Sequence, residues 1–226
     1  MYKYTKLIFD ADNTLFDFDR AEEYALIQTL QHFKMPVPEG LVDFYRSINV
    51  PLWEQLDAKL ITIKELKQKR AEQLFEFIGK RADFNAFSHQ YLNELANQPV
   101  LLPTVEPTLE ELAPHCEMAI ITNGLSQVQN TRFALSSIKH HFKVMVISEE
   151  VGMSKPDPEI FAHACDLMQW SNPKEVLMVG DNYRADIQGA AQFGMQTCWF
   201  NIRQQDHDYT DHHHEIRVFD ELLRHL

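Results

Sequence analysis

Acidic residues stand close together at two places in this 226-residue chain, each time directly after a short apolar run. One pair is Asp10 and Asp12, and the other is Asp181 and Asp186. Two carboxylates two positions apart suit a nucleophile beside a proton donor, and carboxylate oxygens are ligands that Mg²⁺ prefers. A carboxylate and a phosphate ester about 4 Å apart repel by about 4 kcal/mol at an effective dielectric of 20, so a cation must bridge them. The pattern therefore suits magnesium-assisted attack of a carboxylate on a phosphorylated substrate.

Two further segments carry groups that bind anions. Thr122 and Asn123 lie at the end of a third apolar run, and Lys155 lies in the segment SKP at 154–156. An ammonium group, a hydroxyl and backbone N–H groups are suited to hold the oxygens of a transferring phosphoryl group. Ligands of open α/β sheets bind outside the carboxyl ends of the strands. These groups therefore converge on one crevice if the first and fourth strands are neighbours.

The elements that must position these residues are short strands separated by helices. Five apolar runs have strand length, at residues 6–9, 118–122, 144–147, 176–179 and 196–200. Each run is continuous rather than alternating, which is typical of strands covered on both faces. Asp157, Pro158 and Glu159 supply an N-cap, a proline at the first helical position and an acid in the first turn. This alternation predicts an α/β fold with a doubly wound parallel sheet.

The connection between the first and second predicted strands is too long for a simple loop. Between residues 16 and 99 no strand pattern occurs, but amphipathic helical stretches recur, with turns predicted at Pro36–Pro38 and Asn49–Pro51. A connection of this length in a compact domain must be a structured insertion. We therefore expect a helical cap of four or five helices at 16–99, inserted into a core formed by 1–15 and 100–226.

Four segments resemble the ordered motifs of the haloacid dehalogenase (HAD) superfamily of phosphohydrolases. They are DxDxT at 10–14, TNG at 122–124, KPDP at 155–158 and GDxxxxD at 180–186. The resemblance spans nearly the whole chain, because the spacing leaves room for the helical cap of that superfamily between the first two motifs. It implies a HAD-like, Rossmann-type core and a magnesium-dependent hydrolase that works through an aspartyl-phosphate.

The resemblance, carried over residue by residue, makes Asp10 the nucleophile and Asp12 the general acid and base. It implies that Mg²⁺ is bound by the carboxylates of Asp10 and Asp181 and by the backbone carbonyl of Asp12. Lys155 and the hydroxyl of Thr122 are then expected to hold the phosphate oxygens.

Three more residues are expected to support this site. Backbone N–H groups near Asn123 would bind phosphate oxygens beside Lys155. Asp186 would orient Lys155 or a metal-bound water. Thr14 would fix the loop that carries Asp12.

Parts of the chain also resemble the pyrimidine 5′-nucleotidase branch of the superfamily. They are SINVPLW at 47–53, LIT at 60–62, ISEEVG at 147–152 and TCWFN at 197–201. This resemblance implies a nucleoside monophosphate substrate, above all a pyrimidine nucleotide. Tyr45, Trp53 and Arg70 have side chains suited to stacking on a base or bonding its edge, and the alternative is that they pack inside the cap.

The catalytic motifs leave related phosphatases open and count against two other functions. A phosphoglycolate phosphatase, or a sugar-phosphate phosphatase or mutase, shares the motifs and differs mainly in the cap. A haloacid dehalogenase needs Asp10 as nucleophile but neither a second acid at Asp12 nor magnesium. A non-enzymatic receiver-type signalling module accepts phosphate on an aspartate after its third strand and lacks a large helical insertion.

Composition narrows the possible partners. A formal net charge of −12 opposes binding of a nucleic-acid polymer, and 45% hydrophobic residues with 24% charged residues are typical of a globular protein. The N-terminus has no signal-peptide or membrane-spanning pattern, and the three cysteines show no CxxC spacing. We expect a cytoplasmic enzyme with a small phosphorylated substrate and no membrane partner. The histidine-rich segment at 206–214 is expected to be a polar surface loop beyond the last core strand, with transition-metal binding as the alternative.

Overall fold

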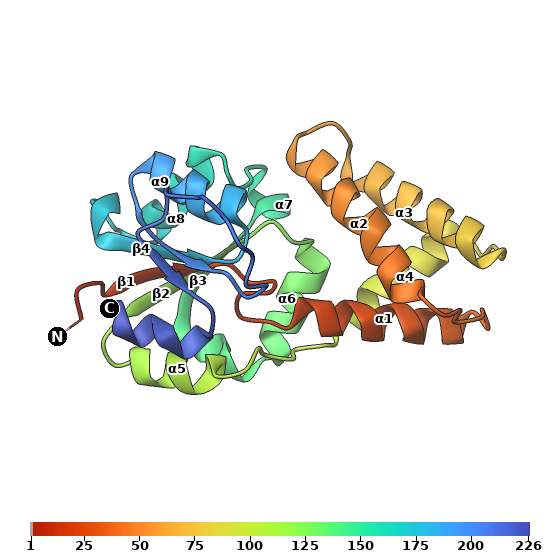
Figure 1. Cartoon of the computed structure of the whole chain (residues 1–226), viewed down its shortest axis with the longest axis horizontal. Helices are drawn as coiled ribbons and strands as arrows, with labels where there is room; N and C mark the ends of the chain where they lie inside the picture. Colours follow the sequence, from red (N-terminus) through yellow and green to blue (C-terminus); the bar gives the residue numbers. More distant parts are fainter. Residues whose placement is uncertain (1) are drawn as a thin grey trace. The chain divides into compact units, whose positions relative to one another are not determined.

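A computed structural model describes residues 2–226 (Figure 1). Within these residues six strands form one sheet in the order β3-β2-β1-β4-β5-β6, and every neighbouring pair is parallel. The strands are β1 (Lys6–Phe9), β2 (Glu117–Thr122), β3 (Phe142–Ile147), β4 (Val176–Gly180), β5 (Gln196–Phe200) and β6 (His214–Ile216). All five predicted strands are present. The parallel order confirms the predicted α/β sheet, with β1 between β2 and β4.

The sheet is buried on both faces. Leu7 and Ile8 are neighbours in β1 but belong to two different apolar clusters, one on each side of the sheet. Helices α8 and α9 cover one face and α5 covers the other (Figure 1). Burial on both faces explains why the strands are continuously apolar. The helical segments that belong with the sheet are α5 (Val105–Leu112), α6 (Ser126–Leu135), η1 (Ser137–His141), α7 (Ser148–Val151), α8 (Pro158–Met168), η2 (Pro173–Glu175), η3 (Tyr183–Gln188), α9 (Gly189–Phe193) and η4 (Phe219–Arg224).

Local sequence explains where several helices begin. Helix α8 begins at Pro158, as predicted, because the ring presets a helical φ and the missing N–H is not needed in the first turn. At the start of η3 the side chain of Asn182 accepts a hydrogen bond from the backbone N–H of Ala185 at 3.0 Å. Thr62 and Glu65 form a reciprocal capping box at the start of α3.

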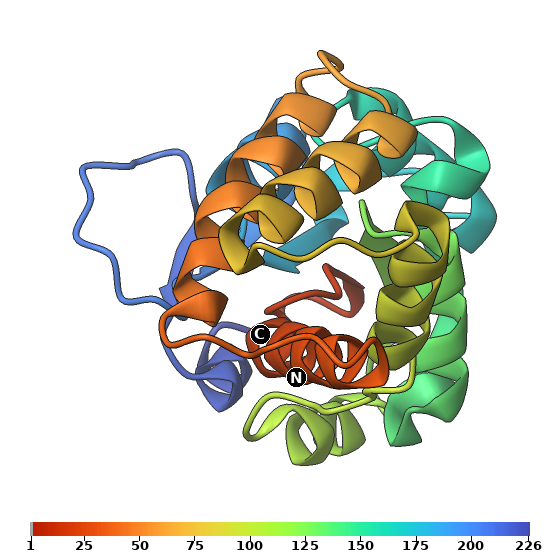
Figure 2. The same cartoon turned by 90° about the vertical axis from the view of Figure 1, so that its right-hand side faces the viewer.

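The chain forms two compact units. One comprises the chain up to Phe18 together with Pro99–Leu226, and the other is Asp19–Gln98. The second unit is built from four helices, of which α2 and α3 run side by side in both views (Figures 1 and 2). They are α1 (Phe18–His32), α2 (Leu41–Asp57), α3 (Ile63–Ile78) and α4 (Phe84–Ala96). No helix among residues 2–226 has the length and apolar character needed to cross a membrane.

The turn predicted at Asn49–Pro51 is wrong, because these residues lie inside α2. Proline lacks the N–H that a helix interior normally uses, so the helix loses one backbone hydrogen bond there. The buried face of α2, which includes Tyr45, Ile48 and Leu52, keeps the helix continuous through this position. The turn predicted at Pro36–Pro38 is confirmed as part of the connection between α1 and α2.

Strand β6 was not expected from the sequence. It pairs with β5 from Cys198 opposite His214 to Phe200 opposite Ile216. The placement of the histidine-rich segment beyond the last core strand is therefore wrong, because the final histidine of the segment begins this strand. The preceding residues form the blue loop that extends from the sheet at the left of Figure 2. A three-residue edge strand with two polar residues carries too little periodicity to be recognised.

Candidate active site

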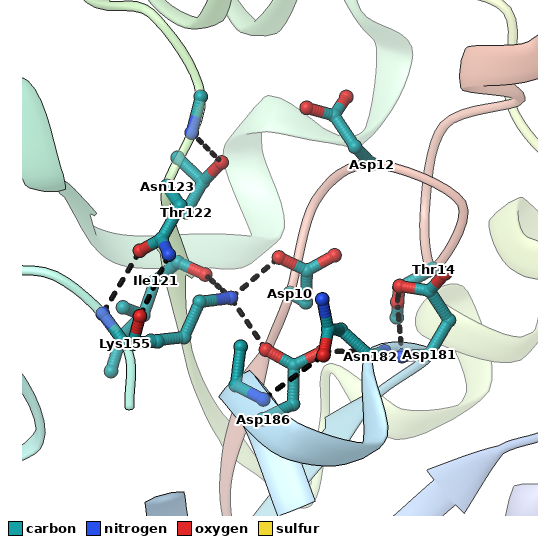
Figure 3. A network of polar contacts seen from close by, with 12 residues as sticks. Asp10, Asp12, Thr14, Ile121, Thr122, Asn123, Lys155, Asp181, Asn182 and Asp186 are labelled. Carbon is teal, nitrogen blue, oxygen red and sulfur yellow. Dashed lines mark hydrogen bonds and ion pairs between the residues drawn. The ribbon is translucent and has the colours of Figure 1, made fainter. Parts of the chain in front are cut away.

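The predicted site residues meet at the carboxyl ends of neighbouring strands. Asp10 follows β1, Thr122 ends β2 and Asp181 follows β4, and these three strands are adjacent in the sheet. Figure 3 shows the side chains of Asp10 and Asp186 turned toward the ammonium group of Lys155. Residues that are more than a hundred positions apart in sequence are thus brought together by the parallel strand order.

Lys155 is the buried cation of this cluster. Its Nζ atom lies 2.6 Å from Oδ1 of Asp10 and 2.7 Å from Oδ1 of Asp186, and it donates to the carbonyl oxygen of Ile121 at 2.8 Å. Burial by itself would lower the pKa of Lys155, but the two carboxylates outweigh burial and hold that pKa above its ordinary value. Lys155 is therefore charged at neutral pH and bound to the side chain expected to be the nucleophile.

The side chain of Asn123 fixes the segment that carries Lys155. Its Nδ2 donates to the carbonyl oxygen of Lys155 at 2.9 Å, and its Oδ1 accepts from the backbone N–H of Lys155 at 2.9 Å. The hydroxyl of Thr122 accepts the backbone N–H of Gly124 at 3.0 Å. Asn123 therefore joins the end of β2 to the segment that carries the lysine, and Thr122 fixes the turn that follows the strand.

Three carboxylates form a group that suits a divalent cation. Oxygen atoms of Asp10, Asp181 and Asp186 lie within 4.8 Å of one another. Burial raises the pKa of Asp10 to about 7, against the opposing effect of Lys155, and repulsion from Asp186 and Asp12 adds to it. Burial, with repulsion from Asp10 and Asp186, also holds the pKa of Asp181 well above its ordinary value.

The donor set of this cluster fits Mg²⁺. Mg²⁺ takes oxygen ligands and commonly uses one or two protein carboxylates, and its charge would relieve the repulsion between Asp10 and Asp181. Asp186 differs from these two because both of its oxygens have protein partners. Its Oδ1, like that of Asp10, is paired with Lys155, and its Oδ2 accepts the backbone N–H of Asn182 at 3.0 Å. The carboxylates of Asp10 and Asp181 are the ones that the sequence predicts as ligands, and this assignment stays a prediction.

Two residues fasten the loop of Asp181. The buried hydroxyl of Thr14 lies 3.4 Å from Oδ1 of Asp181 and accepts the backbone N–H of Asp181 at 3.1 Å. The indole N–H of Trp199 donates to the carbonyl oxygen of Asp181 at 2.9 Å. Thr14 thus joins the loop after β1, which carries Asp12, to the loop after β4.

The carboxylate of Asp12 points away from the Lys155 cluster (Figure 3). Its Oδ2 accepts a hydrogen bond from Nε2 of Gln129 at 2.7 Å, and its Oδ1 is paired with Nη2 of Arg132. Both partners belong to α6, which begins just after the TNG segment. Asp12 is therefore held by a helix, apart from the carboxylates of Asp10, Asp181 and Asp186.

Gln129 and Arg132 are site residues that sequence reasoning missed. They are spaced three apart on α6, so they share one face of the helix, and both are buried. The signal available in the sequence is a pair of polar residues, glutamine and arginine, on one face of the helix that follows the TNG motif. The sequence does not say which loop that face contacts, because this depends on how α6 packs.

The family model for haloacid dehalogenase-like hydrolases matches residues 7–200 of the chain. The chain belongs to this family. The match runs from the first strand, across the helical insertion, to the end of β5, and it therefore includes all the site residues described above.

Individual members of the family resemble the chain over most of its length. It is 31% identical to the pyrimidine 5′-nucleotidase PynA of Streptococcus pneumoniae, with 97% of this chain and 94% of PynA covered. It is 32% identical to the pyrimidine 5′-nucleotidase YjjG of Escherichia coli, with 90% and 89% covered. The magnesium-bound crystal structure of the HAD-hydrolase YfnB from Bacillus subtilis superposes with a TM-score of 0.89 at 28% identity, covering 98% and 97%.

The helical residues considered for base contact are engaged inside their own unit. Tyr45 and Arg70 are buried, and the guanidinium group of Arg70 lies 5.8 Å from the Tyr45 ring centre. Trp53 packs against the apolar cluster of Leu52, Ile61 and Leu66. These contacts favour the packing alternative for all three residues.

Proposed function

We propose that this chain is a magnesium-dependent phosphomonoesterase that forms an aspartyl-phosphate on Asp10 and hydrolyses pyrimidine nucleoside 5′-monophosphates. The observation that carries the proposal is the buried 2.6 Å contact between Asp10 and Lys155, beside the carboxylate of Asp181. A nucleophile, a fixed cation and a carboxylate for a metal ion then share one edge of the sheet. Phosphoryl transfer depends on this kind of positioning and charge stabilisation.

The reaction proceeds in two displacements at phosphorus. In the first, a carboxylate oxygen of Asp10 forms a bond to phosphorus while the bond from phosphorus to the ester oxygen breaks, and Asp12 gives a proton to that leaving oxygen. In the second, Asp12 takes a proton from a water molecule, whose oxygen bonds to phosphorus and releases Asp10 and inorganic phosphate. The carboxylates of Asp10 and Asp181 and the backbone carbonyl of Asp12 would hold Mg²⁺, which would supply charge neutralisation between nucleophile and ester.

Lys155 and Thr122 are proposed to hold the phosphate oxygens, together with backbone N–H groups near Asn123. A charged lysine in a buried site stabilises the oxygens more strongly than it would in water, because few solvent dipoles screen it. Asp186 keeps Lys155 oriented through their 2.7 Å ion pair.

The substrate class rests on the relatives and on the nucleotidase-like segments of the sequence. PynA and YjjG are both pyrimidine 5′-nucleotidases, and each is more than 30% identical to this chain over most of its length. A nucleoside 5′-monophosphate carries the phosphomonoester that the site requires. Its leaving group is an alcohol, which needs the proton that Asp12 is proposed to give.

The direct test is phosphate release from a panel of esters in the presence of magnesium or EDTA. The panel contains UMP, dUMP, dTMP, CMP, AMP, GMP, phosphoglycolate and several sugar phosphates. We expect magnesium-dependent release, fastest with the pyrimidine nucleotides. Asp10→Asn should lower turnover by on the order of 10⁴-fold or more, because loss of a nucleophile removes the covalent route.

The ester panel tests the proposed mechanism and the proposed substrate separately. Preference for phosphoglycolate or a sugar phosphate, with the same dependence on Asp10 and magnesium, would retain the mechanism and overturn the nucleotide assignment. Absence of release from every ester, or full activity of Asp10→Asn, would overturn the mechanism. Far-UV circular dichroism of the variant establishes that it is folded.

A further inference from the structure

Helix α6 holds the side chain of Asp12 at two points. Nη2 of Arg132 is paired with one carboxylate oxygen, and Nε2 of Gln129 donates to the other at 2.7 Å. The two α6 residues are also joined to each other, since Nη2 of Arg132 donates to Oε1 of Gln129 at 3.0 Å. A carboxylate bound through both oxygens has its side-chain torsions fixed.

The burial of Arg132 makes this arrangement costly as a purely structural feature. Its side chain is fully buried, and its Nε and Nη1 atoms have no hydrogen-bond partner within the described chain. The guanidinium group lies 4.7 Å from the ring centre of Phe16, which offers a partial substitute through its π face. An apolar side chain of similar length would fill this position without burying N–H groups that have no partner, so packing alone does not explain Arg132.

Gly124 provides the space through which Gln129 reaches Asp12. A Cβ atom built on Gly124 would overlap the side-chain amide of Gln129. The same glycine donates its backbone N–H to the hydroxyl of Thr122, which is proposed to bind phosphate. The absence of a side chain at Gly124 therefore lets the phosphate-binding segment lie against the group that holds Asp12.

We propose that Gln129 and Arg132 are positioning residues that set the orientation of the Asp12 carboxyl group for proton transfer to the leaving oxygen and, in the second displacement, from the attacking water. The inference rests on the proposed function, in which Asp12 is the acid and base. Each carboxylate oxygen has two lone pairs, so Asp12 can keep its contacts with α6 while it exchanges a proton. Loss of these contacts releases the side-chain torsions, and misplacement of a reacting group by about 1 Å is enough to slow a reaction by about 10²-fold.

The test compares leaving groups. p-Nitrophenyl phosphate has a leaving group that needs no proton, whereas the alcohol released from UMP does. We expect Gln129→Leu and Arg132→Met to lower kcat/KM for UMP by about 10²-fold and for p-nitrophenyl phosphate by less than about tenfold. In an Asp12→Asn background neither substitution should lower UMP hydrolysis further, because residues that act as one unit are not additive.

Controls separate positioning from folding. Because Arg132 is fully buried, Gly124→Ala provides a third variant, which displaces Gln129 without changing either α6 side chain. Asn130→Ala is the matched control on the same helix, since Asn130 contacts Ser126 and Glu150 instead of Asp12. It should keep both activities near those of the parent.

Two results would overturn the inference in an active enzyme. One is an equal loss with UMP and p-nitrophenyl phosphate, and the other is a full additional loss when Gln129→Leu is combined with Asp12→Asn. If the parent hydrolyses another alkyl phosphate of the panel instead of UMP, that ester takes its place in the comparison. A parent that hydrolyses no ester overturns the proposed function, and the inference with it.

Discussion

Asp10 lies in an environment that opposes its ionisation and yet gives it a cationic partner. Burial raises its pKa to about 7, while Lys155 at 2.6 Å favours the charged form. Burial and the neighbouring carboxylates hold the pKa of Asp181 well above its ordinary value. The cationic neighbours of Asp181 do not outweigh these effects. The site therefore binds protons tightly without a metal ion, and a divalent cation competes with those protons.

The metal-free protein should become less stable as pH rises from about 5 to 8. The pKa of Asp10 is about 7 in the folded protein against an ordinary value of 3.8, so the folded state keeps a proton that the unfolded chain has released. Stability linked to that proton is lost as pH rises toward 7, and the raised pKa of Asp181 acts in the same direction. Thermal unfolding in EDTA across this range measures the effect, at about 2–4 °C for each kcal/mol.

Asp181→Asn is the matched variant for this prediction. Its unfolding midpoint in EDTA at pH 8 should exceed that of the parent, because one buried carboxylate is removed from the cluster. Added Mg²⁺ should raise the midpoint of the parent much more than that of the variant. A variant with the same pH dependence and the same response to Mg²⁺ as the parent would contradict the assignment of Asp181 to the metal site.

At the scale of elements, the site depends on how strand ends and helices fit against one another. Gly180 ends β4, and a Cβ atom built there would overlap the carboxylate of Asp186. That carboxylate reaches back over the strand to pair with Lys155 and with the backbone N–H of Asn182. The small residue at the end of β4 is thus required by a close approach rather than by backbone conformation.

Gly180→Ala should lower both stability and activity. We expect a loss of about 1–3 kcal/mol in the free energy of unfolding, because the added methyl group displaces buried atoms. Displacement of Asp186 should also weaken the orientation of Lys155 and reduce turnover. Urea unfolding and ester hydrolysis measure the two effects.

Gly152→Asn is the control for the Gly180→Ala variant. Gly152 has a positive φ of 70°, which asparagine tolerates, and a Cβ atom there would meet no other atom within 4 Å. This variant should stay close to the parent in stability and turnover. Parent-like behaviour of Gly180→Ala would show that Asp186 can move without consequence.

The contact between β5 and the loop after β4 leads to a prediction about metal affinity. Trp199→Phe removes the indole N–H that donates to the carbonyl oxygen of Asp181 at 2.9 Å. Groups that support a metal ligand typically change affinity by about 10–100-fold when lost, so Mg²⁺ affinity should fall by at least about tenfold. Mg²⁺ titrations followed by thermal unfolding or calorimetry measure it.

Trp170→Phe is the matched control, because it loses the same kind of hydrogen bond at a different place. The indole N–H of Trp170 donates to Glu117 at 2.9 Å, at the start of β2 and therefore at the opposite end of the strand from the site. Its Mg²⁺ affinity should be that of the parent. Equal affinities of the two variants would indicate that Trp199 does not support the metal ligand.

At the scale of the whole molecule, the chain consists of two units with separate interiors. The helical unit encloses a polar network in which Nδ2 of Asn49 donates to Glu22 at 2.6 Å and Arg70 donates to Asn49 at 3.1 Å. Arg70 also lies 4.7 Å from the ring centre of Tyr91. Arg70 is therefore bound within the helical unit, where its charge favours ionisation of the buried carboxylate of Glu22 against the effect of burial.

Arg70→Met should destabilise the protein by roughly 3–5 kcal/mol, because it leaves Glu22 buried with less compensation. Where the variant remains folded, the KM for UMP should change by less than about threefold, since a packing role involves no substrate contact. Unfolding and steady-state kinetics together make the test. Lys64→Met, at an exposed position on the same helix, should stay within about 0.5 kcal/mol of the parent.

A large rise in the KM of Arg70→Met for UMP, at unchanged turnover, would contradict this interpretation. That result would support the alternative in which Arg70 contacts the substrate. Parent-like stability would likewise show that the buried network does not need the guanidinium group.

The sequence by itself determined the parallel sheet and the chemistry at its edge. Continuous apolar runs predicted the five longer strands, because strands buried on both faces cannot alternate. Asp10, Thr122, Lys155 and Asp181 could be grouped in advance, since each is covalently tied to the end of a strand or to the loop beyond it. Parallel strands place all such ends at one edge.

Only the tertiary structure decided which side chains touch. Gln129 and Arg132 contact Asp12 because α6 packs with that face toward the loop after β1, and this packing depends on residues distant in sequence. Pro51 lies inside a helix, since the buried face of α2 outweighs one missing hydrogen bond. Strand β6 exists because β5 offers it an open edge. Local patterns are set by neighbouring residues, whereas these features depend on contacts that form only in the folded chain.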